Sequence, residues 1–397
     1  LDPAVSPFLW PPIQSSMPRT FFIAATRQHV GKTSVSMGFV QGLKRRFRRP
    51  ESVAFGKPVG QQHLQIDGMK VDKDVQVLKE HFGLTCKYQD MSPVLVPRGY
   101  TRDFIDGKRS EKDQEDAILR SFEALSRDSD VVVMEGTGHT GVGSIVNMNN
   151  AKVASMLGAE MILIANGGLG SAFDELELNR CMCKEYGVKI SGVVINKVLP
   201  DRVEMIRHYV SKLLERWDVP LLGVVPDESF LGKPSLLDFE RLFDVSLLSG
   251  QKHRLRHYNP SDIHLAAHGL NRFIEMLSKA PTRPLYVTHA SRADITLCFL
   301  NHVERARRAG VDFGGALILC GRPEGEGIPN RYTLDTIAQA SGEGDDGSPV
   351  LYIPKRSWEV ISQLNAYVPK LNIDDEVRCQ VAADHYEKYL DFDVMLR

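Results

Sequence analysis

Cysteine is scarce in this chain, which has six in 397 residues. A secreted scaffold stapled by disulfides is much denser in cysteine, so that class is excluded. Cys181 and Cys183 form the only close pair in the sequence, and this pair lacks the second cysteine pair or the nearby histidines that a zinc site requires. We therefore expect free thiols in a reducing compartment.

Long apolar runs and a strong charge of either sign are also missing. The longest apolar stretches, such as residues 161–165, are far shorter than the ~20 residues of a membrane-spanning helix. Lys and Arg number 49 against 50 Asp and Glu, which leaves a formal net charge of -1. Such a balance gives no basic surface for nucleic acid. We expect a soluble protein, without membrane insertion or nucleic-acid binding, in the cytoplasm or in an organelle matrix (mitochondrion or plastid).

The length bounds the number of domains, and the N-terminus stands apart from them. With ~100–200 residues per domain, 397 residues predict two domains. The chain begins at Leu1 rather than Met, and its first 16 residues are rich in proline and show no periodicity. We interpret residues 1–19 as an extension or the remnant of a processed leader, and a trimmed or incomplete sequence would explain this start as well.

Short strand-like runs alternate with helix-length segments over the first half of the chain. This rhythm is typical of a doubly wound, mostly parallel α/β sheet. The sequence Gly31-Lys32-Thr33, where the first strand-like run turns into a helical pattern, makes the predicted fold P-loop NTPase-like. The rhythm weakens in the charged stretch 228–258, where we place the boundary between a P-loop domain (20–250) and a second, smaller α/β domain (251–397). In the latter we expect a helix over 263–277 and a terminal helix over 375–390. The strand-like runs of the first domain are residues 21–25, 52–55, 131–134, 161–165, 192–195 and 221–225.

A phosphate-binding loop is predicted where the first strand turns into the first helix, over residues 25–33. Backbone N–H groups at a helix N-terminus face an anion, and a glycine lets the backbone approach it closely. The lysine would bridge the β- and γ-phosphates, and the threonine hydroxyl would ligate Mg²⁺. The predicted nucleotide-binding residues are Val30, Gly31, Lys32, Thr33 and Ser34.

The loop departs from the standard Walker A spacing at its first glycine. That place is taken by Thr26, or by Ala25 if the loop is one residue longer. A chance Gly-Lys-Thr at a helix start is the competing interpretation, and the strand–loop–helix context favours the phosphate loop.

Three polar residues follow other predicted strands of the same domain. Glu135 stands at the carboxyl end of its strand, where it would hold Mg²⁺ or a bound water, although acidic residues there often only cap a turn. Lys57 would meet a substrate carboxylate or phosphate, with a solvated surface lysine as the alternative. Asn196 carries an amide with both a donor and an acceptor, which suits the edge of a purine.

These residues resemble the dethiobiotin synthetase-like branch of P-loop proteins, and most closely the N-terminal region of long bacterial phosphotransacetylases. The resemblance implies ATP and Mg²⁺ as ligands. It implies that Lys57 contacts substrate, that Glu135 and Asp74 assist Mg²⁺, that Asn196 contacts adenine, and that Lys32, Lys57 and Glu135 are the catalytic set. The matching stretches, in the order and approximate spacing of the family, are residues 30–36, 55–59, 133–136, 192–197 and 222–226.

The second domain carries a further resemblance at residues 288–294. This stretch is similar to the signature of the DRTGG domain, which follows the P-loop domain in those phosphotransacetylases and is regarded as regulatory or ligand-binding. Arg292 and Asp294 match the signature, and Ser291 stands where an aspartate is common. In the P-loop, Arg27 and His29 stand where the dethiobiotin enzymes usually carry acidic residues.

Three functions stay open at this point. The one we favour is a P-loop nucleotide (ATP)-binding protein that regulates or scaffolds a protein partner or a homo-oligomer through its second domain. The second is an ATP-dependent carboxylate-activating ligase or cyclo-ligase of the dethiobiotin synthetase type. The third is a structural subunit of a larger complex with a degenerate nucleotide site, for which the missing loop glycine is the motive.

Overall fold

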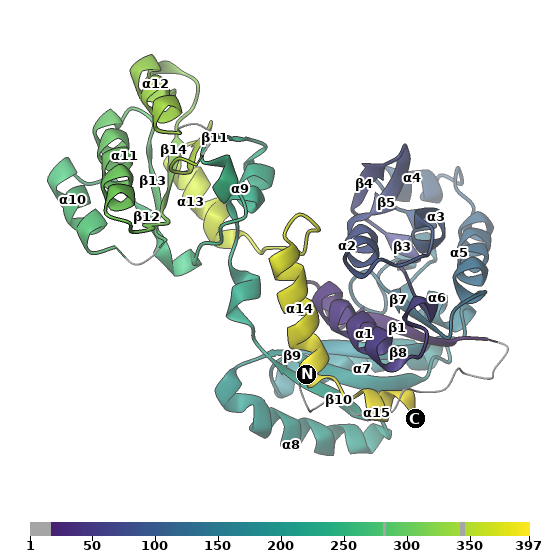
Figure 1. Cartoon of the computed structure of the whole chain (residues 1–397). Helices are drawn as coiled ribbons and strands as arrows, with labels where there is room; N and C mark the ends of the chain where they lie inside the picture. The colour runs from purple at the N-terminus through teal and green to yellow at the C-terminus, as the bar shows by residue number, and fades with distance from the viewer. Residues whose placement is uncertain (1–16, 281–282, 342–345) are drawn as a thin grey trace. The chain divides into compact units, whose positions relative to one another are not determined.

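The chain folds into two compact units, shown in the computed structural model of Figure 1. The structure describes residues 17–280, 283–341 and 346–397, so the predicted extension 1–19 lies almost entirely outside it. One unit comprises the chain up to Glu228 together with Leu371–Arg397, and the other comprises Ser229–Lys370.

A six-stranded sheet forms the centre of the first unit, and all of its strands are parallel. Its central strands are mainly apolar and are buried except at the ends of β1 and β8, as expected for a parallel sheet covered on both faces. The order of the strands confirms the predicted doubly wound fold. In that order they are β10 (Leu221–Pro226), β9 (Ile190–Val198), β8 (Glu160–Asn166), β1 (Arg19–Ala25), β7 (Val131–Glu135) and β2 (Val53–Gly56).

The helices of the first unit follow the strands along the chain (Figure 1). Those between the strands are α1 (Lys32–Arg46), α2 (Lys73–Phe82), α3 (Tyr88–Met91), α4 (Tyr100–Ile105), α5 (Glu111–Ser126), α6 (Asn150–Met156), α7 (Gly170–Glu185) and α8 (Val203–Leu214). Two more helices from the end of the chain join this unit, α14 (Glu376–Tyr389) and α15 (Phe392–Leu396).

The strand order has its switch point beside the first loop. After β1 the chain runs to β2 at the edge of the sheet and then returns to insert β7 between them. The direction in which successive strands are added to the sheet therefore reverses at β1, which has β7 on one side and β8 on the other. Ligands of open α/β sheets bind outside the carboxyl ends of the strands at such a point.

Two small sheets precede α2 in the same unit. One pairs β3 (Val59–Gly60) with β6 (Val94–Leu95), and the other is a hairpin of β4 (His63–Ile66) and β5 (Met69–Asp72). Both turn residues of the hairpin, Asp67 and Gly68, have positive φ, at 47° and 78°, which suits the right-handed twist of its strands. The hairpin ends at Asp72, directly before α2.

The compact units differ from the domain limits expected from the sequence. The division falls after Glu228 rather than after residue 250, and the terminal helix belongs to the first unit. Close packing of α14 on α1 is the physical reason, since the two helices lie side by side (Figure 1). A Cβ atom on Gly38 of α1 would lie only 2.4 Å from the Cβ of Tyr386. A pattern read along the chain carries no signal for such a return.

The second unit is a smaller α/β layer structure. Its sheet has the order β11 (Leu247–Ser249), β15 (Val350–Ile353), β14 (Ala316–Cys320), β13 (Leu285–His289) and β12 (Ile263–Leu265), with only the β11–β15 pair antiparallel. Its helices are α9 (Leu236–Phe243), α10 (Leu270–Ser278), α11 (Ala293–Arg308), α12 (Arg331–Ala340) and α13 (Ser357–Ala366).

The helix predicted over 263–277 is wrong in its first part. Residues Ile263–Leu265 form β12, which pairs with β13, and the helix α10 begins only at Leu270. The alternation Ile-His-Leu suits a strand, but three residues are too few for periodicity to separate a strand from a helix.

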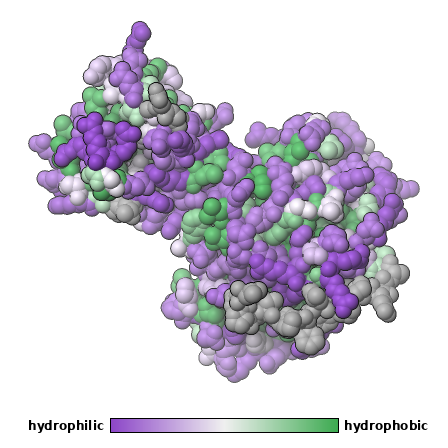
Figure 2. Space-filling model, in the orientation of Figure 1, coloured by the Kyte–Doolittle hydropathy of each residue, from purple (hydrophilic) through white to green (hydrophobic). Residues whose placement is uncertain are grey.

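Within the described residues, no helix has the length and apolar character needed to cross a bilayer. The face seen in Figure 2 is mainly hydrophilic, with scattered hydrophobic areas.

Candidate nucleotide-binding site

The predicted phosphate loop connects β1 to α1, and its unusual backbone angles fall near its end. His29 has φ 61° and Gly31, the residue before α1, has φ 96°. Neither Ala25 nor Thr26 has a positive φ, so this loop does not need a glycine at either place. Thr26 is buried, and its hydroxyl donates a hydrogen bond of 2.8 Å to Glu175 of α7. A polar anchor thus stands where the standard loop has its first glycine.

Gly31 is required both by its conformation and by its surroundings. Its φ lies in the left-handed region, where side chains with a Cβ are strained. A Cβ atom there would also lie 2.7 Å from Nδ2 of Asn196. The first turn of α1 that follows presents Lys32 and Thr33 beside the carboxyl end of β7.

Glu135 ends β7 and faces this first turn. Its side chain is 1% exposed, and it accepts hydrogen bonds from the hydroxyl of Thr33 at 3.1 Å and from that of Ser36 at 2.7 Å. Burial raises the pKa of Glu135 to about 7, with the Asp74 carboxylate acting in the same direction, although Lys57 and Lys32 oppose the rise. The predicted pair of Thr33 and Glu135 is therefore brought into direct contact. Ser36 has a part in the site that sequence reasoning did not assign.

Lys32 interacts electrostatically with Glu135 and with the neighbouring Lys57 and Asp74. Its pKa is lowered, first by burial and then by the charge of Lys57, while Glu135 and Asp74 oppose the change. Desolvation is relieved when an ammonium group meets an anion, so a phosphate beside Lys32 would be favoured.

Lys57 is buried and already paired with two carboxylates. Its ammonium contacts Oδ1 of Asp72 at 3.0 Å and also Oδ2 of Asp74. Burial alone would lower the pKa of Lys57, but Asp74 and Asp72 raise it above the ordinary value. The solvated surface lysine considered from the sequence is thus not what the structure shows. Asp74, which the family resemblance assigned to Mg²⁺, instead forms an ion pair with Lys57 in this structure.

Asp72, two residues from Asp74 and the other candidate for the family's aspartate, also belongs to this cluster. Its Oδ1 accepts the backbone N–H of Asp74 at 3.0 Å and so caps the N-terminus of α2. Its Oδ2 is buried and has no hydrogen-bond partner among the described residues. Burial raises the pKa of Asp72. The spacing of two acidic residues around position 73 was the available signal, since such residues often cap a helix.

Asn196 holds the loop in this structure. Its side chain is fully buried, with Nδ2 donating to the carbonyl oxygen of Val30 at 2.7 Å and Oδ1 accepting from the N–H of Lys197 at 2.8 Å. The ammonium of Lys197 donates to the carbonyl oxygen of His29 at 2.9 Å. The end of β9 therefore fixes the two residues before Gly31.

The terminal helix α14 also reaches the loop, through Tyr386. The Tyr386 hydroxyl shares side-chain hydrogen bonds with Asn196 and with Ser34, and burial raises the pKa of this tyrosine to about 12. It lies 3.6 Å from where a Cβ on Gly31 would stand. No motif in the sequence pointed to this contact, because the tyrosine comes from the far end of the chain.

Around these contacts α1 and α14 are joined by charges as well as by close packing. Glu387 of α14 is 9% exposed and accepts hydrogen bonds from Gln41 at 2.9 Å and from Arg46 at 3.2 Å. The guanidinium of Arg46 also lies over the Phe392 ring, 4.2 Å from its centroid. The C-terminal segment is thus part of the packed structure of the first unit.

A loop of this shape between β1 and α1, with a partly buried lysine, a threonine bonded to a glutamate and a parallel sheet, defines a P-loop nucleotide-binding domain. Comparison with known families identifies it further. Residues 19–235 match the family described as "AAA domain", and the chain belongs to that family.

Curated relatives extend over nearly the whole chain. It is 27% identical over 392 residues to the phosphate acetyltransferase of Nitratidesulfovibrio vulgaris and 27% identical over 383 residues to that of Pseudomonas putida. Each match covers 94% of this chain and 51% of the relative. The resemblance to long phosphotransacetylases is therefore confirmed. The chain spans about half the length of the curated relatives it matches.

Several solved structures resemble about half of the chain. A putative plasmid partition protein from Borrelia burgdorferi bound to AMPPNP has a TM-score of 0.35 at 12% identity, covering 54% of this chain and 89% of that one. MinD from Aquifex aeolicus has a TM-score of 0.33 at 12% identity, covering 54% and 84%. These likenesses are too low to carry over a ligand or a partner.

Proposed function

We propose that the P-loop domain binds ATP with Mg²⁺, and that this binding regulates or scaffolds a partner through the second unit. One observation carries the proposal: the hydroxyl of Thr33 donates to the carboxylate of Glu135 at 3.1 Å, in the first turn of α1 that follows the left-handed Gly31 and holds the partly buried Lys32. A chance Gly-Lys-Thr would have no reason to face a buried carboxylate.

The oxygen donors at this place fit Mg²⁺. That ion keeps several waters and takes one or two protein oxygens together with phosphate oxygens, rather than a cage of protein ligands. Thr33 and Glu135 offer such a pair. Within the described ranges, no cluster of three or more His, Cys, Asp or Glu side chains could hold a metal ion by itself. A site completed by a nucleotide fits this arrangement, and Asp74 would join it only by leaving Lys57.

The chain's own residues have separate tasks in this proposal. Loop N–H groups and the N-terminus of α1 face the phosphates, and Lys32 places its ammonium at the β- and γ-phosphates. Tyr386 and Asn196 hold the loop in shape through Ser34 and Val30. When bound, ATP supplies a transferable phosphoryl group, and Mg²⁺ supplies a charge that neutralises it.

A regulatory role is supported by the second unit rather than by the loop. Arg292 and Asp294, which match the DRTGG signature, pair through two hydrogen bonds of 2.8 Å. Arg292 also donates to the carbonyl oxygen of His268 at 3.0 Å. These bonds tie the start of α11 to the segment before α10. We propose that this DRTGG-like unit meets a protein partner or a second copy of the chain.

Phosphate acetyltransferase activity belongs to relatives of which this chain spans about half. It comes to this chain only as a proposal, in which these two units serve such an enzyme as its nucleotide-dependent part. The bacterial relatives favour the cytoplasm over an organelle matrix as the proposed location.

The carboxylate-activating ligase is the second candidate, and the state of Lys57 weighs against it. A lysine that receives a substrate carboxylate has to be available, whereas Lys57 is 7% exposed and held by Asp72 and Asp74. Releasing it would leave the buried carboxylate of Asp72 and the partly buried carboxylate of Asp74 without their cation. The third candidate is a structural subunit of a larger complex with a degenerate nucleotide site. Failure of the chain to bind any nucleotide would favour it.

The regulator and the ligase are separated by measuring ADP release and hydrogen exchange together. With ATP–Mg²⁺ present, we expect slow or absent ADP release and a changed rate of amide exchange in residues 229–370. ADP release that depends on an added carboxylate or diamine would favour the ligase. Unchanged exchange in the second unit at saturating ATP would contradict the regulatory role. Lys70→Ala, an exposed lysine of the β4–β5 hairpin, is the control and should behave as the parent protein.

A further inference from the structure

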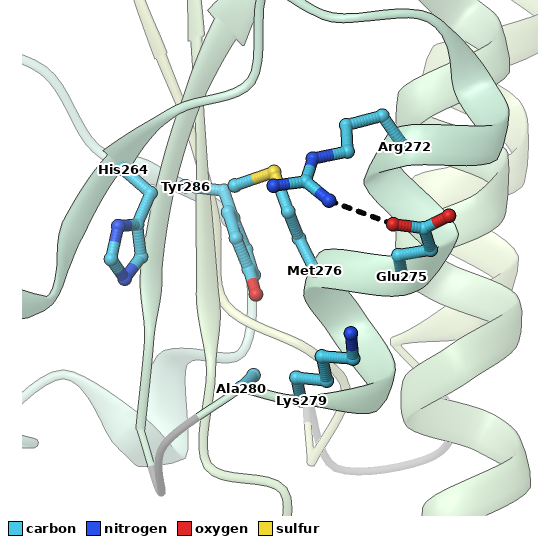
Figure 3. A pocket seen from close by; sticks show the side chains of 7 residues that line it. All are labelled: His264, Arg272, Glu275, Met276, Lys279, Ala280 and Tyr286. Atoms are coloured by element: carbon cyan, nitrogen blue, oxygen red, sulfur yellow. Dashed lines mark hydrogen bonds and ion pairs between the residues drawn. The ribbon is translucent and has the colours of Figure 1, made fainter.

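A pocket of about 240 Å³ lies in the second unit, far in the sequence from the phosphate loop. Its floor comes from the paired strands β12 and β13, on which His264 and Tyr286 are neighbours in register. Its wall comes from α10. Figure 3 shows the residues that line it, namely His264, Arg272, Glu275, Met276, Lys279, Ala280 and Tyr286.

Tyr286 is the feature that points to a ligand. Its residue is 1% exposed, and its ring packs edge-on against Phe273 and Phe299 at centroid distances of 5.1 Å and 6.3 Å. Its hydroxyl has no hydrogen-bond partner within the part of the chain that the structure describes, and it is directed into the pocket (Figure 3). A hydroxyl that opens on the pocket, with no protein partner among the described residues, is free to bond to a ligand there.

The proton of this hydroxyl is retained at neutral pH. Burial raises the pKa of Tyr286 to about 12, so the group is a hydrogen-bond donor under ordinary conditions. A donor of this kind suits an acceptor on the ligand. His264, whose ring is tilted by 37° to that of Tyr286 at a centroid distance of 5.9 Å, also lines the pocket.

The charges on α10 determine the sign of the ligand. Arg272, Glu275, Met276 and Lys279 follow one another at helical spacing and share one face. Arg272 and Glu275 form an ion pair of 2.7 Å and so balance one another. Lys279 has no ion pair among the described residues, which leaves one excess positive charge. Met276 and Ala280 supply an apolar surface between the polar groups.

We propose that this pocket binds a small organic anion, whose carboxylate or phosphate group meets Tyr286 and Lys279 and whose apolar part lies on Met276. The volume admits only a small molecule, since pockets for drug-sized ligands start at roughly 300 Å³. The site is independent of the phosphate loop, so it stands or falls apart from the proposed ATP binding.

The test titrates two probes, inorganic phosphate and propanoate, into the full chain carrying Lys32→Ala, which removes the phosphate loop as a competing anion site. Binding is followed by NMR of labelled methionine methyl groups, where Met276 reports on the pocket directly. We expect saturable binding of at least one probe, weakened roughly tenfold by Tyr286→Phe and by Lys279→Gln. The preferred probe then distinguishes a carboxylate ligand from a phosphate ligand.

Two controls keep this test decisive. Tyr286→Phe removes a hydroxyl that has no hydrogen-bond partner among the described residues, so its thermal midpoint should not fall below that of the parent. Lys252→Gln changes an exposed lysine of the same unit, which pairs with Asp346, and should leave probe binding unchanged. Shifts of the Met276 signal that do not saturate with either probe, or binding that survives both pocket variants, would overturn the proposal.

Discussion

Gly38→Ala is expected to destabilise the first unit by about 2 kcal/mol or more and to release the C-terminal segment. The added Cβ would lie 2.4 Å from the Cβ of Tyr386 and 2.7 Å from the backbone nitrogen of Glu387, so α1 and α14 would have to move apart. Alanine is ordinarily better in a helix than glycine by about 1 kcal/mol, and this gain is too small to compensate. Chemical unfolding and limited proteolysis of residues 371–397 measure the effect.

The same variant also tests whether the terminal helix supports the phosphate loop. Tyr386 reaches Ser34 and Asn196 only while α14 is in place, so ATP affinity should fall together with stability. Gly170→Ala is the matched control, because it adds the same methyl group at the start of α7 where no atom lies within 4 Å. Equal stability of Gly38→Ala and the parent would show that α14 does not pack as described.

Glu135 is expected to make the stability of the first unit fall as pH rises from about 4.5 toward 7. Its folded pKa is about 7 against an ordinary value of 4.5, so in this window the folded state keeps a proton that the unfolded state has lost. The contribution of Glu135 to the free energy of unfolding is therefore fully present below the ordinary pKa of 4.5 and is lost as the pH rises through the folded pKa of about 7. The difference corresponds to at most about 3 kcal/mol.

Glu135→Gln should remove this part of the pH dependence and raise stability at neutral pH. It should also weaken Mg²⁺-dependent binding of ATP, since an amide carries no charge for the metal, and abolish any gain in affinity as the carboxylate ionises near pH 7. Unfolding curves and ATP titrations between pH 5 and pH 8 provide both readouts. Glu123→Gln, at an exposed glutamate paired with Arg127, is the control. Identical pH profiles for Glu135→Gln and the parent would contradict the assignment.

The sequence predicted what depends on neighbours along the chain. The places of the strands along the chain, the loop between β1 and α1, and the position of Glu135 at the end of β7 all follow from local patterns and from the rule that parallel strands end at one edge. Contact between Thr33 and Glu135 follows from that rule, because β1 and β7 are neighbours.

What the sequence did not predict depends on contacts between distant segments. Lys57 is closed off by carboxylates that the β4–β5 hairpin brings to it, and no spacing along the chain measures that approach. Tyr386 reaches the loop because two helices far apart in sequence meet at Gly38. The loop does without its first glycine because Thr26 adopts an ordinary backbone conformation and bonds to Glu175.

The most direct test of the account is a calorimetric titration of ATP–Mg²⁺ into the full chain and into Lys32→Ala, with Lys70→Ala as the matched control. We predict saturable binding by the parent and by the control, and a loss of affinity on the order of 100-fold in Lys32→Ala, as expected when a charged hydrogen bond to phosphate is removed. No binding by the parent, or equal binding by all three proteins, would contradict a working phosphate loop and favour a fold retained for assembly.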